Sequence, residues 1–599
     1  MRNMRINHKK YLQCQFIVLT LLTAISFTAS GQNYTKRYAL IPMRDGVKLY
    51  TEIYEPADTC RHPVLIMRTP YSLGHYGEDV FNKESFGLDS IYLKHNYIFV
   101  KQNVRGRYLS EGLFMQVRPY NAAKHGDATD EASDTYDTVE WLLLHCHTNG
   151  RVGVKGTSYP GFYALMAALS GHPAIKAVSP QAPVGDWFMG DDIHHNGALM
   201  LMDSYSFGSS FFRKRLAVSK KAMPSLLPVD TTVNIFYHRP LDNILSPVLE
   251  EGSFWQDIVG HPSYDEFWRK RRSANGVRGL KPAVMVVGGL FDAEDNYGTW
   301  STWRNIQTMS PGTPLYLVEG PWYHHGWNNA KYQHLDDAWF GKGSAFYFMN
   351  DIEYPFFAYY LEDKGNRPAA VTLLPSMETA RSKIQDRCSD SLWIRLESWP
   401  PRGMRYEAFR LRGDTVVSDP DNPVPYYHTL TTRSRKREYM AADQSFASVR
   451  KDVCTTMERE LSDTLRLFGP VKVRLDLITD ATDLDAIVKL IDVRPDGYQM
   501  LIRGDVMPAR FRRSFEKPVP IKSGRKFSLS FTMPDIAHVV LPGHRLMVQV
   551  QYSCFPLIAV NPQKFLPNPY KATKQDYQKA RVILLDSSVV ELPVVTSRL

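Results

Sequence analysis

Apolar residues follow two different patterns in the first part of this chain. Short, mainly apolar runs recur between residues 63 and 318, and they are typical of parallel strands covered on both faces. These runs are residues 63–67, 97–100, 152–155, 283–287 and 315–318. Between two of them, residues 130–144 place apolar side chains three or four positions apart, which predicts an amphipathic helix. The alternation of the two patterns predicts an α/β fold with a parallel sheet.

The alternation stops after residue 197, and a third pattern begins after residue 368. Residues 197–277 are helical and aromatic in character, and they predict a helical insertion that caps the active site. Beyond Gly365–Pro368, short β runs separated by turns predict an all-β sandwich. The predicted domains are a signal peptide (1–31), an α/β domain in two parts (32–196 and 278–368), the helical cap (197–277) and the β-sandwich (369–599).

The first 31 residues have the order of a secretory signal peptide. A basic segment precedes an apolar stretch over Phe16–Phe27, and small residues follow at Ala29–Gly31. The apolar stretch is too short to span a bilayer comfortably. An uncleaved membrane anchor is the alternative interpretation. We expect cleavage before Gln32 and an exported protein, periplasmic or secreted, with no membrane segment after cleavage.

Charge and cysteine content exclude several classes of function. The formal net charge of +10 is modest for 599 residues, and no basic run is interleaved with aromatic residues, so nucleic acid is not an expected partner. Removal of the signal peptide would leave five cysteines, so at least one is unpaired. The sequence contains no C-x-x-C pair, the motif that would indicate zinc or redox chemistry. We predict no metal and no cofactor.

A candidate nucleophile lies where one of the predicted strands turns into a helix. The segment Gly156–Gly161 reads Gly-Thr-Ser-Tyr-Pro-Gly, and a mainly apolar strand precedes it while an apolar helix follows. A tight, glycine-flanked turn with serine at its tip is the nucleophile elbow of an α/β-hydrolase. Ser158 is therefore the candidate nucleophile. An ordinary strand-to-helix turn is the alternative on this hexapeptide alone.

Two further residues follow in the order that an α/β-hydrolase triad requires, which is serine, then an acid, then histidine. Asp292 comes just after the strand 283–287, and His324 lies on the loop after the next strand, 315–318. Catalytic groups of such sheets lie at the carboxyl ends of the strands. We predict that His324 takes the proton of Ser158 and that Asp292 orients the imidazole. His325 is an alternative base.

The oxyanion of an acyl-transfer reaction needs two donors. One is predicted to be the backbone N–H of Tyr159, directly after the nucleophile. The strand 63–67 ends in Arg68-Thr-Pro-Tyr71, and the hydroxyl of Tyr71 is a candidate for the second. The alternative is that Tyr71 only packs against Pro70.

Together these motifs resemble the family of cocaine esterase, Xaa-Pro dipeptidyl-peptidase and glutaryl acylase. The resemblance covers nearly the whole mature chain and rests on residues 68–71, 104–106, 110–112, 156–161, 288–292, 320–324 and 541–551. It implies an α/β-hydrolase with a helical cap and a C-terminal jelly roll, and it implies Tyr71 as the second oxyanion donor. It also implies a homo-oligomer, although no interface is visible in the sequence. The family has aspartate where this chain has Asn103.

Within the family the chain looks most similar to α-amino-acid ester hydrolases, which bind the substrate ammonium with three carboxylates. By that resemblance the three are Glu294 and Asp295, which follow Asp292, and Asp192 of the Gly190–Asp192 segment. A cluster of carboxylates in a cleft creates a negative field that a cation relieves. The alternative is that Glu294 and Asp295 cap the next helix and that Asp191 and Asp192 face solvent.

Three functions remain open on these observations. The first is an exported serine hydrolase acting on α-amino-acid esters or amides, including acyl transfer to β-lactam nuclei. The second is an Xaa-Pro dipeptidyl-peptidase, whose substrate also carries a free amine, with a general esterase or glutaryl-type acylase beside it. The third is a glycan-binding surface protein without activity, against which the Ser158, Asp292 and His324 set argues. The expected partner is a small amino-acid ester, an amide or a short peptide.

Overall fold

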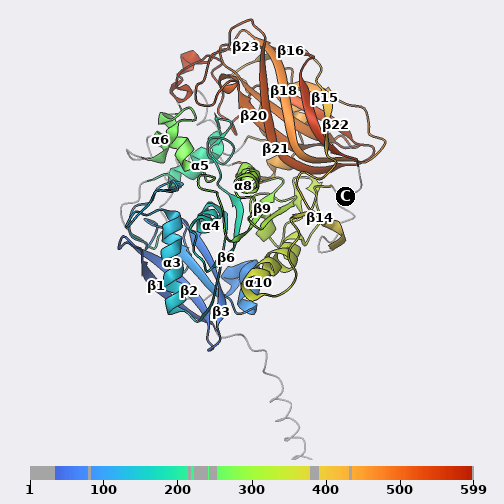
Figure 1. The fold of residues 1–599 in the computed structure, drawn as a ribbon. Coiled ribbons are helices and arrows are strands. Elements are labelled where there is room, and N and C mark those ends of the chain that lie inside the picture. The colour runs from blue at the N-terminus through green and yellow to red at the C-terminus, as the bar shows by residue number, and fades with distance from the viewer. Residues whose placement is uncertain are drawn as a thin grey trace, which may run out of the picture.

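The computed structural model describes residues 34–78, 83–213, 218–221, 241, 244, 253–377, 390–430 and 435–596. It has an α/β domain and an all-β domain, which Figure 1 shows in blue to yellow and in orange to red. The predicted signal peptide and much of the insertion between residues 214 and 252 lie outside the described residues, so cleavage before Gln32 stays a prediction. No helix among the described residues is long and apolar enough to span a membrane.

A ten-stranded sheet forms the centre of the α/β domain. Its strands in spatial order are β1 (Tyr34–Pro42), β2 (Lys48–Pro56), β4 (Ile98–Asn103), β3 (His62–Thr69), β5 (Thr148–Ser158), β6 (Ile175–Pro183), β9 (Ala283–Gly289), β10 (Leu315–Gly320), β13 (Val371–Leu373) and β14 (Ile394–Leu396). The strands from β4 to β13 run parallel, and β1, β2 and β14 add antiparallel edges. The predicted α/β class and all five predicted strands are confirmed.

Along the chain, the helices of this domain alternate with the strands of the parallel sheet. The main ones are α3 (Glu131–His145), α4 (Tyr159–Leu169), α8 (Asn296–Met309) and α10 (Tyr354–Glu362), with the shorter α2 (Ser90–Lys94) and α9 (Ser344–Tyr347). The predicted helix at 130–144 is α3, and its first turn is fixed by Asp130, whose side chain accepts the N–H of Ser133. Helix α10 packs closely on β5, because a Cβ on Gly153 would lie 2.8 Å from the ring of Phe357.

The described part of the insertion is helical, as predicted. The short strand β7 (His194–His195) lies just before it, and it contains the short strand β8 (Ala198–Leu199) and the helices α5 (Leu201–Phe211), α6 (Phe254–Gly260) and α7 (Glu266–Arg271). Figure 1 shows α5 and α6 at the level where the two domains meet. Buried aromatic side chains such as Trp255 and Trp268 hold these helices together.

The C-terminal domain consists of two antiparallel sheets. One contains β15 (Arg405–Arg410), β24 (Val589–Val595), β18 (Leu465–Thr479), β23 (Ala580–Leu584) and β16 (Asp414–Ser418), with β21 (Phe527–Val540) paired to β18. The other contains β17 (Cys454–Met457), β22 (Arg545–Gln551), β19 (Asp485–Val493) and β20 (Gln499–Pro508). Their inner faces share one core, to which Leu475 of β18 and Val488 of β19 belong. The predicted all-β sandwich is confirmed.

The structure places one boundary differently from the sequence pattern. The β-sandwich was predicted to begin at residue 369, but β13 and β14 continue the central sheet, and β15 at Arg405 is the first strand of the sandwich. Short β runs look alike in sequence whichever sheet they join. The β pattern therefore begins along the chain before the first strand of the sandwich. The four cysteines in the described residues, Cys60, Cys146, Cys454 and Cys554, are free.

Candidate active site

The predicted site residues lie at the carboxyl ends of neighbouring strands in the middle of the central sheet. Strands β5, β6, β9 and β10 are neighbours and run parallel, so the segments that follow them meet at their carboxyl ends. Ser158 ends β5, Asp192 lies on the segment after β6, Asp292 follows β9 and His324 follows β10. The fold thus gathers residues separated by up to 166 positions along the chain, as expected for an open parallel sheet.

Ser158 has the strained backbone of a nucleophile elbow. Its φ is +68°, a conformation that residues with a side chain rarely adopt, and it directly precedes α4. The two glycines permit the turn, because a Cβ on Gly156 would lie 2.3 Å from the carbonyl oxygen of Pro160. A Cβ on Gly161 would lie 2.6 Å from the carbonyl oxygen of Gln181. The spacing Gly-x-Ser-x-x-Gly is one residue wider than the common Gly-x-Ser-x-Gly elbow. It suits this turn, because the second glycine is needed where α4 crosses β6.

His324 is paired with Asp292. Its Nδ1 lies 2.8 Å from Asp292 Oδ2, while Asp292 Oδ1 accepts the N–H groups of Glu294 (2.8 Å) and Asp295 (3.1 Å). Burial alone would raise the pKa of Asp292, but His324 and the two N–H groups hold it below its usual value. Asp292 is thus a buried, ionised acceptor that fixes the orientation of the imidazole.

The segment after His324 is hydrogen-bonded to the strand ends beside Ser158. Trp327 Nε1 donates to Gln181 Oε1 at 2.8 Å, and the same oxygen accepts the hydroxyl of Thr157 at 3.1 Å. Asn328 Nδ2 lies 3.5 Å from Thr157 Oγ1. These contacts fix the histidine loop against the residue that precedes the nucleophile.

His325 has different surroundings from His324. Its backbone is left-handed, with φ of 70°, and the residue is exposed. Its ring stacks with that of Trp327 at 6.2 Å, and its Nδ1 lies 3.5 Å from Asn328 Nδ2. The carboxylate of Asp292 contacts His324 instead. The geometry therefore favours His324 over His325 as the candidate base.

The two candidate oxyanion donors lie on the segments that flank Ser158. The N–H of Tyr159 belongs to the first residue of α4 and so has no acceptor within the helix. Tyr71 packs against Phe211 of α5, with ring centroids 5.4 Å apart. Burial and the nearby carboxylates of Asp192, Asp295 and Glu294 raise its pKa well above the usual range, so its hydroxyl stays a donor.

Asn103 supports Tyr71, a role that the sequence did not reveal. Its Nδ2 donates to the carbonyl oxygen of Tyr71 at 2.8 Å, and its Oδ1 accepts the hydroxyl of Tyr76 at 3.0 Å. An ionised aspartate has no donor for that carbonyl. The departure from the family pattern is thus accommodated by a specific pair of hydrogen bonds.

The three predicted carboxylates lie together. The N–H of Asp192 donates to the carbonyl oxygen of Glu294 at 3.0 Å, and Asp192 Oδ2 accepts Trp187 Nε1 at 2.9 Å. Burial and the negative charge of Glu294 raise the pKa of Asp192 to about 6. Both carboxylate oxygens of Asp295 are buried without a hydrogen-bond partner, and burial with Asp192 nearby raises its pKa well above the usual range.

The alternative roles for these carboxylates do not fit the geometry. Asp295 precedes α8 but makes no capping hydrogen bond with its side chain. Asp191 is fully buried and accepts three backbone N–H groups, from Gly185, Asp186 and Gly298, so it supports the loop while Asp192 lies beside Glu294. A buried cluster with two unsatisfied oxygens suits a cationic ligand.

Glu294 also touches the candidate base. Its Oε2 lies 3.3 Å from His324 Nε2, the nitrogen opposite the one that contacts Asp292. Burial would lower the pKa of His324, but Asp292 and Glu294 raise it to about 10. The imidazole therefore lies between two carboxylates, which favour its protonated form.

Two charged residues at the site had not been predicted. Arg435, in the segment before β17, contacts Glu294, and Asp203 of α5 contacts Arg435. In the sequence, Arg435 is 141 positions away from Glu294 and 232 positions away from Asp203. No local motif marks either Arg435 or Asp203. Sequence patterns are sensitive to residues within one element, so this contact between domains had no signal.

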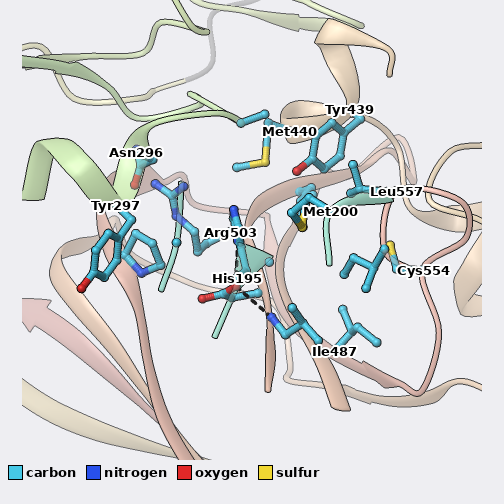
Figure 2. Close-up of a pocket in the computed structure, with 18 of the residues that line it drawn as sticks. His195, Met200, Asn296, Tyr297, Tyr439, Met440, Ile487, Arg503, Cys554 and Leu557 are labelled. Carbon is cyan, nitrogen blue, oxygen red and sulfur yellow. Dashed lines mark hydrogen bonds and ion pairs between the residues drawn. The ribbon is translucent and has the colours of Figure 1, made fainter. Parts of the chain in front are cut away.

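A cavity of about 40 Å³ lies behind the loop that carries Asp292 and Glu294. Both domains line it. Figure 2 shows Tyr439, Met440 and Leu557 on one side, Asn296 and Tyr297 on the other, and Arg503 between them. Its volume suffices for a few water molecules only. The cavity therefore marks the packed junction of the two domains behind the site rather than a substrate pocket.

Comparison with known proteins gives a consistent result. Residues 45–326 match the X-Pro dipeptidyl-peptidase (S15 family), and residues 369–582 match the X-Pro dipeptidyl-peptidase C-terminal non-catalytic domain. The chain is 26% identical to cocaine esterase of Rhodococcus sp. (strain MB1 Bresler), over 86% of this chain and 90% of that protein.

Two solved structures are similar over nearly the whole length. An α-amino acid ester hydrolase is 30% identical, with a TM-score of 0.84 and coverage of 96% of this chain and 99% of that one. An aminopeptidase from a marine sediment archaeon, Thaumarchaeota archaeon, is 29% identical, with a TM-score of 0.84 and coverage of 94% and 97%. With the α/β-hydrolase fold and the all-β domain described above, these matches show that the chain belongs to the cocaine esterase and X-Pro dipeptidyl-peptidase family of serine hydrolases.

Proposed function

We propose that this protein hydrolyses esters or amides of α-amino acids whose α-amine is free, through an acyl-enzyme on Ser158. The observation that carries the proposal is the group of carboxylates of Asp192, Glu294 and Asp295 beside the Asp292–His324 pair. Asp295 is fully buried, and Asp192 and Asp295 have no cationic partner among the described residues. An α-ammonium next to the scissile carbonyl would supply that cation. The resemblance to an α-amino acid ester hydrolase and to an aminopeptidase supports the same substrate class.

The proposed chemistry is acyl transfer by a serine nucleophile. Ser158 Oγ attacks the carbonyl carbon while neutral His324 accepts the hydroxyl proton at Nε2, and Asp292 stabilises the imidazolium. The negative oxygen of the tetrahedral intermediate is stabilised by the N–H of Tyr159 and the hydroxyl of Tyr71. His324 then gives its proton to the leaving alcohol or amine, and water releases the acid by the same steps in reverse.

The carboxylates would recognise the ammonium by charge. Burial and mutual repulsion raise the pKa of both Asp192 and Asp295, so these carboxylates bind protons more readily than free carboxyls do. A bound ammonium favours the ionised forms, and the interaction is strong because the cluster is shielded from water. An uncharged N-acetyl group would leave those charges uncompensated, so such substrates would be rejected.

Replacing Asp192 with asparagine is expected to lower kcat/KM for p-nitrophenyl esters of α-amino acids by about 30-fold or more. The physical reason is the loss of one charge from a shielded ammonium–carboxylate contact. The matched substrate is the ester in which hydrogen replaces the amine, and its kcat/KM should stay nearly unchanged. An equal loss for both esters would mean that Asp192 supports the catalytic residues or the fold, and it would overturn the assignment.

Replacing Glu294 with glutamine is expected to move the acid limb of the pH profile toward lower pH. Glu294 lies 3.3 Å from His324 Nε2 and is one of the carboxylates that raise the pKa of His324 to about 10. Without its charge the imidazolium is less stable, so the neutral base is present at lower pH. The measurement is kcat/KM against pH with the amine-free ester, because the titration of the substrate amine then does not contribute. A shift toward higher pH, or none, would contradict the arrangement.

A substrate panel separates this proposal from its alternatives. Amino-acid p-nitrophenyl esters, their N-acetylated forms and Xaa-Pro anilides should be compared under one condition. Preference for the free amino-acid esters supports the proposal, whereas preference for Xaa-Pro anilides favours a dipeptidyl-peptidase. Equal turnover of free and N-acetylated esters favours a general esterase or glutaryl-type acylase.

A further inference from the structure

One arginine of the C-terminal domain reaches the carboxylate cluster. Arg435 Nη2 lies 2.6 Å from Glu294 Oε1, and Arg435 Nε lies 2.9 and 3.0 Å from the two carboxylate oxygens of Asp203. Only 9% of the arginine side chain is exposed. The contact therefore joins three parts of the chain: the loop after Asp292, helix α5 of the insertion and the segment between β16 and β17 of the C-terminal domain.

Arg435 balances the negative charges of Glu294 and Asp203 but does not contact Asp192 or Asp295. Burial favours the neutral form of an arginine, but Asp203 and Glu294 raise the pKa of Arg435, so it stays cationic. Within the described residues, no cationic side chain lies within ion-pair distance of Asp192 or Asp295. One cation thus serves Glu294 and Asp203 and leaves the other two carboxylates for a ligand.

The two oxygens of Glu294 have separate partners. Oε1 is held by Arg435, and Oε2 faces His324 Nε2 at 3.3 Å. A glutamate has three rotatable side-chain bonds, so a fixed partner on one oxygen determines where the other oxygen points. Without Arg435, the partly buried carboxylates of Glu294 and Asp203 would be like charges without a shared cation, which favours protonation or displacement of one of them.

The backbone of the same loop is held by a second arginine. Arg503 of β20 is fully buried, and its Nη2 donates to the carbonyl oxygens of Leu290 (2.7 Å) and Asp535 (2.9 Å). The β-sandwich therefore fixes the main chain before Asp292 and the side chain after it. Arg435 acts on a carboxylate whose backbone is already in place.

We propose that Arg435 is a positioning residue for amine recognition: it fixes Glu294 against Asp203, so that the site presents one oriented carboxylate and leaves Asp192 and Asp295 for the substrate ammonium. This inference rests on the function proposed above. It gives the C-terminal domain, which matches a family domain described as non-catalytic, a direct part in substrate selection.

The test compares Arg435→Gln and Arg435→Lys with the wild-type enzyme on two substrates. These are the p-nitrophenyl ester of phenylalanine and that of 3-phenylpropionate, which lacks the amine. For Arg435→Gln we expect KM for the aminated ester to rise about tenfold or more with kcat within about threefold, since uniform binding is lost. Both constants for the amine-free ester should stay within about twofold. Arg435→Lys should restore part of the binding, because it keeps the charge but not the two-sided geometry.

Arg269→Gln is the matched control. Arg269 of α7 also joins the insertion to the β-sandwich, through an exposed ion pair with Glu516 at 2.7 Å, and it contacts none of the site carboxylates. It should change neither substrate. Equal losses on both substrates for Arg435→Gln, or a lower KM for the aminated ester, would overturn the inference. If Arg435→Gln does not fold, Asp203→Asn removes the other partner of the arginine and should give a smaller loss confined to the aminated ester.

A double substitution adds a readout that a structural role would not give. Because Arg435 acts through Glu294, Arg435→Gln should have no further effect on the aminated ester in a Glu294→Gln background. Additive losses would contradict the proposal. If the wild-type enzyme cleaves N-acetylated esters as readily as free ones, the proposed function itself fails. If the wild type selects the free amine and Arg435→Gln keeps that selectivity, only the role of Arg435 fails.

Discussion

Substitution of Ser158 by alanine is expected to lower kcat by at least about 10⁴-fold while the fold stays intact. Ser158 is the residue at the tip of the strained turn between β5 and α4, and no other group in the proposed reaction forms the bond to the acyl carbon. A loss of 10⁴ corresponds to about 5.5 kcal/mol of transition-state stabilisation. Steady-state turnover of an amino-acid p-nitrophenyl ester measures it.

Covalent labelling provides an independent check on the same variant. A fluorophosphonate should modify the wild-type enzyme and leave Ser158→Ala unlabelled. Ser170, at the other end of α4, offers a matched control, because its hydroxyl donates to the carbonyl oxygen of Ala167 and accepts the N–H of His172, away from the site. Ser170→Ala should retain both labelling and activity. Labelling of Ser158→Ala at the wild-type level would show that another serine is the nucleophile.

Substitution of His324 by alanine is expected to cause a loss of similar size, whereas His325→Ala should keep most of the activity. His324 Nδ1 is held by the buried carboxylate of Asp292 at 2.8 Å, so Nε2, which faces Glu294 Oε2 at 3.3 Å, is the nitrogen that would accept the serine proton. His325 is exposed, and its ring lies beside that of Trp327, whereas Asp292 contacts His324. Single-turnover kinetics on one ester compare the two variants directly.

The pair of histidine variants controls for the loop itself. Both residues lie in the segment that Trp327 and Asn328 anchor to β5 and β6, so a loss caused by loop disorder would affect both variants alike. Thermal unfolding of the two variants should be similar. Retained activity in His324→Ala together with a large loss in His325→Ala would reverse the assignment of the base.

The sequence allowed the position of the candidate site, at the carboxyl ends of the parallel strands, to be predicted because its signals are local. Ser158, Asp292 and His324 each follow a short apolar strand, and parallel strands bring their carboxyl ends to one edge whatever the distance along the chain. The choice of Asp192 over Asp191 came from family resemblance. The geometry agrees with it, because Asp191 is used by three backbone N–H groups.

Other features depend on packing that no local pattern encodes. Strands β13 and β14 look like sandwich strands in sequence, yet they pair with β10 and with each other because that edge of the central sheet is open to them. Asn103 supports Tyr71 through a hydrogen bond between residues 32 positions apart in the sequence. The two residues meet because the ends of β3 and β4 are neighbours in the sheet.

The sequence by itself thus determined the two domain types, the order of the catalytic strands and the identity of the residues that follow them, since periodicity and turn chemistry act over a few residues. Only the tertiary structure decided how the charges of the site are shared. The ion pairs of Arg435 with Asp203 and Glu294 span 232 and 141 positions. They exist because the β-sandwich packs over the catalytic edge, where a buried carboxylate requires a partner that only a distant part of the chain can supply.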